Sequence, residues 1–373
     1  MNNINLGLEG VVVGCTGISD VDGAAGRLSY RGHDIEQLVE RPFLQVAWLV
    51  LFGEYPSLRQ EQQLAHFLLE HRRMTQWELA ALQSLPADTH PMLVLQALVP
   101  VLELEQRASI DLPFGGDDAL HGLIIAARLP TLIANWYQWQ RNETPAARNN
   151  SIDPHRAFLQ SLHGREPDPL AVASLDRAQI LQMEHSYNAG TFAGRVCLST
   201  RAPIQSSLAA SLGTLFGALH GGADQAALEF ATQVGEPDNA ARAVKELVAS
   251  GGRVMGIGHR EYRTLDPRAA LLLPMARDLC ATDPESARLL ATLEAIEAAC
   301  TDQLQKPGKV LRANVEFYKG AVFHALGIPS RFFTAVFAMS RVWGYIAHAL
   351  EFRPDSRLIR PRALYKGRDN AAA

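Results

Sequence analysis

Two histidines beside glycines, together with one glutamate, are the residues of this chain best suited to acid–base chemistry. His220 stands in the run LHGG, His259 follows Gly258, and Glu316 stands in the run NVEFY. Glycine beside a histidine lets backbone or ligand approach closely, and it suits a tight turn or a helix end. Carbon–carbon bond formation through an enolate needs three such groups: one removes a proton, one stabilises the oxyanion and one protonates the electrophile. The alternative is that each histidine is a core residue with satisfied hydrogen bonds.

Arginines near these groups indicate an anionic substrate. Arg263 and Arg268 follow His259, and Arg341 lies in an otherwise apolar run from Phe333 to Leu350. A guanidinium can hold a carboxylate through two parallel hydrogen bonds, and a buried guanidinium needs a counter-charge from the protein or from a ligand. Arg263 and Arg268 could instead belong to a solvated loop. The whole set suits a substrate with several carboxylates.

Two further segments carry polar groups whose role the sequence alone does not decide. In residues 184–188 an acid, an imidazole (His185) and an amide (Asn188) stand within one or two helical turns, which could equally be a buried polar cluster. Arg360 lies near the chain end, where free tails and arms that reach a partner both occur.

The elements that position these groups are predicted to be helices. Only the first 40 residues differ: short strand-like runs at 11–13 and 27–31 flank a turn at 20–23 and predict a small hairpin. The runs 43–52, 92–104 and 120–139 are apolar or amphipathic without strand-like alternation. Pro130 predicts a kink or a break in the third run. The expected fold is therefore mainly α with a small N-terminal β hairpin.

Composition excludes several classes of partner. The 373 residues carry a net charge of −4, which gives no electrostatic basis for binding nucleic acid or an anionic membrane. No metal-binding spacing occurs among the histidines, so we expect no structural or catalytic metal. The four cysteines are far apart and indicate buried thiols in a reducing compartment, the cytoplasm. The N-terminus lacks the features of a signal peptide.

At the level of motifs the chain resembles the citrate synthase family, in its shorter bacterial form that includes 2-methylcitrate synthases. The resemblance rests on the runs GREPDP, NAGTFAGRV, ALHGGADQAALE, VMGIGHREYRTLDPRA, NVEFYKG and IRPRALYKG, in this order. It implies a two-domain helical fold. A large domain of residues 1–221 plus 327–373 would carry a small domain, 222–326, that closes over the active site. It also implies a homodimer in which Arg360 reaches the active site of the other subunit.

The resemblance implies an acyl-CoA:oxaloacetate condensing enzyme, an acyltransferase that converts the acyl group to alkyl on transfer. Glu316 would remove the α-proton, His220 would donate to the thioester oxygen, and His259 would protonate the ketone oxygen. The CoA thioester is a substrate, so no cofactor is implied. The remaining assignments are substrate binding by His185, Asn188, Arg268, Arg341 and Arg360, and CoA binding by Arg263, Lys309 and Arg312.

Departures from the family pattern concern the half of the site that would activate the thioester. The usual PNVDFYS reads ANVEFYK from Ala313 to Lys319, so that glutamate replaces the catalytic aspartate. The usual NAST reads NAGT, which places Gly190 where the family has a serine that orients the histidine. The usual GPLHGGAN ends in Asp224. The glutamate carboxylate is displaced by about 1.5 Å, one C–C bond length, relative to aspartate.

Three interpretations of these departures stay open at the level of sequence. The backbone could have shifted to seat the longer base in an ordinary synthase. The site could be adapted to another acyl-CoA or another 2-oxo acid. The chain could also be a weakly active or inactive paralogue that binds a dicarboxylate or CoA as a sensor or accessory protein.

Overall fold

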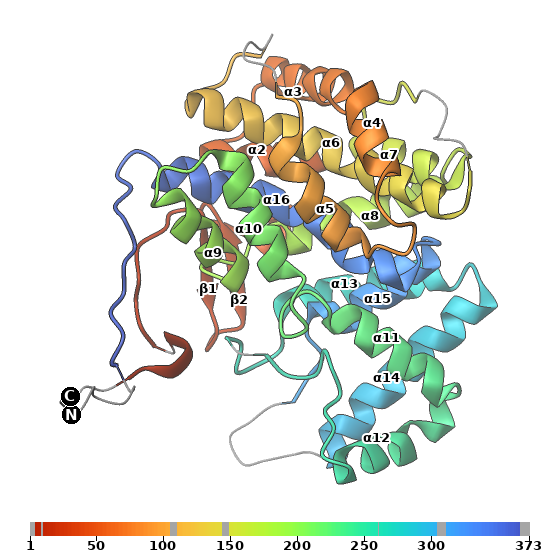
Figure 1. The fold of residues 1–373 in the computed structure, drawn as a ribbon. Coiled ribbons are helices and arrows are strands. Elements are labelled where there is room, and N and C mark those ends of the chain that lie inside the picture. Colours follow the sequence, from red (N-terminus) through yellow and green to blue (C-terminus); the bar gives the residue numbers. More distant parts are fainter. Residues whose placement is uncertain are drawn as a thin grey trace, which may run out of the picture.

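The computed structural model describes residues 4–8, 10–104, 110–143, 149–259, 261–303 and 311–365. Within these ranges the chain is mainly helical and carries one small antiparallel sheet near its N-terminus (Figure 1). The predicted fold class is confirmed. Lys309, expected to contact CoA, lies outside the described residues.

The sheet consists of β1 (Ser19–Asp22), β2 (Arg27–Tyr30) and β3 (His33–Asp34). Strands β1 and β2 pair from Ser19 with Tyr30 to Asp22 with Arg27, and Asp22 accepts hydrogen bonds from the backbone amides of Ala24 and Ala25 in the turn between them. An N-terminal hairpin is therefore confirmed, but the turn expected at 20–23 is wrong, because residues 20–22 belong to β1 and the turn spans residues 23–26. The strand expected at 11–13 is wrong, because this segment is exposed and extends along the surface without joining the sheet.

Most helices pack around α16 (Phe333–Phe352), in which every residue from Phe333 to Leu350 is buried. A helix that is apolar on all sides belongs in the centre of a helical layer. Its direct neighbours among the helices that precede residue 216 are α2 (Phe43–Phe52), α5 (Pro91–Leu98), α6 (Gly116–Gln140), α8 (Pro169–Gln182), α9 (Ala189–Leu198) and α10 (Ile204–Leu215) (Figure 1). The other helices of this part of the chain pack against these neighbours or against the sheet: α1 (Ile35–Leu38), α3 (Leu58–His71), α4 (Gln76–Gln83) and α7 (Pro154–His163).

Prolines shape two of these helices differently. Helix α6 continues through Pro130, so the expected break is wrong. Tertiary packing on both sides of a long helix can outweigh the loss of one backbone hydrogen bond. The helix expected at 92–104 ends earlier: α5 stops at Leu98, and Pro100 lies in the following 3₁₀ turn, Val99–Val101.

The remaining helices, α11 to α15, form the lower right part of Figure 1. They are α11 (Ala223–Val234), α12 (Ala240–Ala249), α13 (Pro267–Cys280), α14 (Pro284–Gln303) and α15 (Val315–Ala325). Helix α15 packs against α11, α13 and α14, and α13 and α15 both contact α8 of the other group. The division into domains of residues 222–326 and the remainder, with closure between them, stays a prediction. Short 3₁₀ turns complete the described elements: Leu6–Leu8, Pro237–Asn239 and Ser330–Phe332.

Three composition-based expectations can be compared with the described residues. Cys280 and Cys300 are buried, but Cys15 is exposed and Cys197 is partly so, which corrects the expectation of four buried thiols. No group of histidine, cysteine or carboxylate side chains there is arranged to hold a metal ion. No helix in the described ranges has the length and apolar character needed to cross a membrane.

Candidate active site

Seven of the residues singled out from the sequence line one cavity of about 1180 Å³. They come from five places in the chain: the α8–α9 connection, the segments around the starts of α11, α13 and α15, and the middle of α16. They are His185, Asn188, His220, His259, Arg268, Glu316 and Arg341. Groups more than 150 residues apart in sequence therefore share one space with acid–base and cationic character.

His259 is fixed by the backbone that follows it. Its Nδ1 accepts hydrogen bonds from the amides of Glu261 (3.0 Å) and Tyr262 (3.1 Å). A neutral ring that accepts at Nδ1 carries its proton on Nε2, so that Nε2–H is a hydrogen-bond donor. Arg268 Nη2 lies 3.4 Å from this Nε2. A donor and a cation therefore stand side by side, as the carbonyl and carboxylate of a 2-oxo acid require.

Asp266 joins the Arg268 helix to the Glu316 helix. Both of its oxygens accept hydrogen bonds from Arg268, at 3.0 and 2.9 Å, and Oδ2 also accepts the amide of Val315 at 3.1 Å. Burial alone would raise the pKa of Asp266, but the charge and hydrogen bonds of Arg268 hold it below its usual value. The pair raises the pKa of Arg268, which remains cationic. The N-termini of α13 and α15 are thereby held together.

The His259 loop is also bonded directly to the segment that precedes Glu316. Gly258 N donates to Arg312 O at 2.7 Å, and the Asn314 side chain donates to Gly258 O at 2.8 Å. Gly256 has φ of 79°, and a Cβ on it would lie 3.0 Å from the Cβ of Phe317. Only glycine combines this backbone angle with so close an approach.

His185 lies in the connection between α8 and α9, and not on a helix as its spacing suggested. Ser186 has φ of 51°, and its amide donates to Ser19 Oγ at 2.8 Å, so the chain turns sharply here. His185 Nε2 lies 3.2 Å from the hydroxyl of Tyr262. Asn188 begins α9 by accepting the amide of Thr191.

His220 is oriented by Asn188. Its Nε2 lies 3.3 Å from Asn188 Oδ1, and its amide donates to Gly217 O at 2.8 Å. At Gly190, where the family has its orienting serine, a Cβ would lie 2.1 Å from the hydroxyl oxygen of Tyr345. The Tyr345 ring therefore occupies the volume that a serine side chain would need.

Glu316 is the pocket end of a chain of buried charges. Its Oε2 lies 2.5 Å from Lys319 Nζ, and Lys319 Nζ lies 3.2 Å from Asp224 Oδ2. The side chains of Lys319 and Asp224 are 1% and 0% exposed, whereas that of Glu316 is 13% exposed. Burial raises the pKa of Asp224 to about 6, against the opposing charge of Lys319.

Burial and nearby cations keep the histidines of the cavity neutral. Burial, followed by the charges of Arg341 and Lys319, lowers the pKa of His220 to about 4. Burial and Arg268 lower the pKa of His259 to about 4, against opposing contributions from Asp266 and Glu316. Burial, Arg268 and the neighbouring His259 hold the pKa of His185 well below its usual value. Neutral imidazoles can donate hydrogen bonds to developing oxyanions at neutral pH.

Sequence and structure comparisons identify the relatives of this arrangement. Residues 7–362 match the family model described as "Citrate synthase, C-terminal domain". A citrate synthase of Acidithiobacillus ferridurans is 34% identical over 98% of this chain and 96% of its own length. A 2-methylcitrate synthase of Shewanella oneidensis is 35% identical over 97% and 94%.

A solved structure agrees. It is a ternary complex of carboxymethyl coenzyme A and oxaloacetate with the citrate synthase of Thermoplasma acidophilum. It superposes with a TM-score of 0.89 at 26% identity and covers 100% of this chain and 98% of its own. The chain belongs to the citrate synthase family.

Three residues that the family resemblance would place near the substrates do not line the cavity. Arg263, Arg312 and Arg360 are exposed, and Arg360 Nη1 donates to the neighbouring carbonyl of Pro361. The terminal arm that carries Arg360 runs away from the helical body and lies near the N-terminal arm (Figure 1). Arg312 adjoins Leu311, which does line the cavity.

Several residues of the site were not predicted from the sequence. Tyr262 and Asp266 flank predicted residues, and the run HREYRTLDPR could have indicated them as hydrogen-bond partners. Lys319 and Asp224 were noted only as departures, because nothing local predicts an ion pair between residues 95 positions apart. Tyr345 gave no signal, because a tyrosine in an apolar helix is ordinary.

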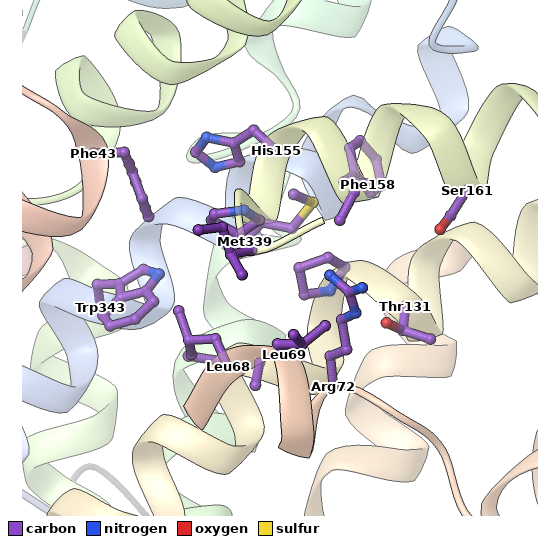
Figure 2. Close-up of a pocket in the computed structure, with 16 residues that line it drawn as sticks. Phe43, Leu68, Leu69, Arg72, Thr131, His155, Phe158, Ser161, Met339 and Trp343 are labelled. Carbon is purple, nitrogen blue, oxygen red and sulfur yellow. The ribbon is translucent and has the colours of Figure 1, made fainter. Parts of the chain in front are cut away.

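A second, smaller cavity lies elsewhere, among α2, α3, α6, α7 and α16. Figure 2 shows it, with Phe43, Leu68, His155 and Trp343 around it and Arg72 at its edge. It contains none of the candidate catalytic or binding residues. Its lining is mostly apolar, and its one histidine, His155, is paired with Asp176.

The low histidine pKa values predict how stability depends on pH. His220 and His259 take up protons near pH 4 in the folded chain and near 6.5 in the unfolded chain. The unfolded state therefore binds more protons in this window, and the free energy of unfolding falls as pH decreases through it, by up to roughly 3 kcal/mol per histidine. Urea unfolding of the ligand-free protein between about pH 7 and pH 4.5 measures this slope.

Variants distinguish the contribution of the site histidines to this pH dependence from that of other groups that titrate in acid. We expect His220→Asn to give a shallower fall than the native chain, and His66→Asn on the exposed face of α3 serves as the matched control. An identical slope in the native chain and His220→Asn would contradict the assignment.

Proposed function

We propose that this chain condenses an acyl-CoA with oxaloacetate and then hydrolyses the thioester, as an acyltransferase of the citrate synthase type. The observation that carries the proposal is the shared cavity: two arginines, three neutral histidines, an amide and a glutamate face one space. This set can bind a dicarboxylate and can also move a proton, which a binding protein would not require.

The arginines and His185 suit the oxo acid. Arg268 and Arg341 offer two cationic donors, and each can take a carboxylate through parallel hydrogen bonds. Arg341 donates Nε to the carbonyl of Gln182 and lies 4.7 Å from the centroid of the Phe337 ring. The buried Glu184 is also near: burial acts to raise its pKa, and the charge of Arg341 is among the contributions that lower it. The side of Arg341 that lines the cavity would bind a substrate carboxylate.

The reaction then uses one group for each transfer. Glu316 takes a proton from the carbon α to the thioester, and His220 donates a hydrogen bond to the oxygen on which the negative charge develops. The enolate carbon attacks the ketone carbon of oxaloacetate. His259 protonates the resulting alkoxide through Nε2, the nitrogen that its backbone contacts leave as a donor. Water then hydrolyses the thioester and releases CoA.

We also propose a homodimer in which Arg360 of the partner subunit completes the dicarboxylate site. Both terminal arms expose apolar side chains in the single chain: Leu6 is 85% exposed, Val12 87% and Tyr365 77%. Exposed apolar side chains gathered on projecting segments are typical of surfaces that a second chain covers. Arg263, Arg312 and Lys309 remain the proposed contacts of CoA, and the four free cysteines fit a cytoplasmic protein.

A panel of acyl-CoAs tests the activity. We expect release of free thiol when the protein is mixed with oxaloacetate and at least one of acetyl-CoA, propionyl-CoA or a longer acyl-CoA, because the acid–base groups are all present. Release without oxaloacetate is the control for simple hydrolysis. Calorimetric binding of oxaloacetate without thiol release from any acyl-CoA would contradict the proposal.

The arm residue has its own test. We expect Arg360→Ala to weaken oxaloacetate binding by about tenfold or more while the protein stays dimeric, because one charge-assisted contact is lost. Calorimetry and analytical ultracentrifugation measure the two quantities, with Arg357→Ala on the same exposed arm as the matched control. Unchanged affinity in Arg360→Ala would contradict its role in the partner's site.

A further inference from the structure

We propose that Lys319, which is paired with Asp224, positions the carboxylate of Glu316 for proton abstraction. In this proposal the three residues act as one set, and the set adapts the site to a glutamate base. The inference rests on the proposed function, since it assigns Glu316 as the base. Lys319 and Asp224 are positioning residues in this proposal, because they act through Glu316.

The geometry gives each residue a different place along one line of charge. Asp224 is fully buried in the first turn of α11, Lys319 is buried on α15, and Glu316 reaches the cavity one helical turn before Lys319. The ammonium also lies 3.8 Å from the centroid of the Phe337 ring, a residue that lines the cavity. The line therefore runs from the protein interior to the cavity and ends at Glu316.

Buried charges of this kind are costly unless they are paired. An ammonium removed from water needs counter-charges at close range, and removal of one partner leaves the others buried and uncompensated. Lys319 has three N–H donors, of which one points to Glu316 Oε2 at 2.5 Å, while Asp224 Oδ2 lies 3.2 Å from the same nitrogen. The ammonium is therefore hydrogen-bonded to Glu316 and ion-paired with Asp224.

A glutamate base needs a positioning contact of this kind more than an aspartate base does. Its side chain has one more rotatable bond, so an unsupported carboxylate would sample more positions at the edge of the cavity. A catalytic group that is misplaced by about 1 Å can lose about 100-fold in rate. Because Lys319 holds Oε2, the second oxygen of Glu316 is left in a defined place to take the α-proton.

The same contacts link the base to the oxyanion donor. Asp224 lies four residues after His220, and α11 packs against α15. Lys319 also contributes, after burial and Arg341, to the low pKa of His220. A single ammonium therefore contacts Glu316 directly and acts electrostatically on His220.

All three members are also positions at which the chain departs from the family motifs. The motif resemblance implies aspartate, serine and asparagine at these positions, where this chain has Glu316, Lys319 and Asp224. Three unrelated substitutions would have no reason to meet within 3.2 Å in the folded chain. Their contact indicates that they function as a set.

Removal of the ammonium is the first test. With the acyl-CoA that the panel identifies, we expect Lys319→Met to lower kcat by about 100-fold while the calorimetric Kd for oxaloacetate changes less than twofold, because the dicarboxylate is held by other residues. We also expect a larger primary isotope effect on kcat with α-deuterated acyl-CoA, since enolisation becomes the slow step. A purely structural role would leave this isotope effect unchanged.

Further variants guard against simple misfolding. Lys245→Met, on the exposed side of α12, is the matched control. The double variant Lys319→Met with Asp224→Asn is used if the single variant does not fold. It removes the cation and one buried anion together, so no uncompensated charge is left at Asp224. If the native chain is active and Lys319→Met changes its kcat by less than twofold, the positioning role is overturned and the proposed function is not. A native chain that is inactive with every acyl-CoA overturns the proposed function first.

Exchange of the base tests whether the three residues act as a set. We expect Glu316→Asp to lower kcat by about 10-fold to 100-fold in the native chain, because the shorter side chain draws the carboxylate away from Lys319. In a chain that carries Lys319→Ser and Asp224→Asn, the same Glu316→Asp change should raise kcat by about tenfold, since the usual family set is then restored. A rise in kcat on Glu316→Asp in the native chain would overturn the proposal.

Discussion

The ammonium of Lys319 sets the constraint on which this site depends. A lysine that is 1% exposed can stay charged only if the chain brings anions to it. Asp224 and Glu316 do so from two helices, and their attachment fixes α11 against the first turns of α15. A second buried ion pair reaches the start of α15: Asp266 binds Arg268 and also accepts the amide of Val315. The N-terminus of α15 is thus held by two buried ion pairs, one toward each histidine loop.

The two ion pairs create different electrostatic surroundings in the two halves of the cavity. Around His259 the cation Arg268 is matched by Asp266, and Arg341 adds a second cation that lines the same side of the cavity. An anionic substrate is attracted to that side. Around Glu316 the group of three carries one more carboxylate than ammonium, which suits a base that must take a proton from carbon. One cavity can therefore bind an anion at one side and keep an anionic base at the other.

Much of this could be predicted from sequence, and the rest fails for physical reasons that differ from residue to residue. The helical fold, the presence of an N-terminal hairpin with a strand at residues 27–30, and the gathering of the seven cavity residues follow from local patterns and family motifs. The strand expected at 11–13 is absent because β-branched residues need a neighbouring strand to pair with. Pro130 leaves α6 continuous because packing along a long helix outweighs one lost hydrogen bond. The Lys319–Asp224 pair depends on tertiary contact alone.

The departures from the family pattern are therefore best understood together with what surrounds them. Gly190 lacks the usual serine, and the hydroxyl of Tyr345 occupies the space that a side chain there would need. Asn188 still orients His220. Glu316 is longer than the usual aspartate, and Lys319 holds its carboxylate. A chain that had merely lost its function would have no constraint to keep a costly buried lysine between two carboxylates, or to fill one vacated position with a particular ring. The changes at Glu316, Lys319 and Asp224 contact one another, and Tyr345 lies against Gly190. These contacts favour a site rebuilt for proton abstraction over one that has decayed.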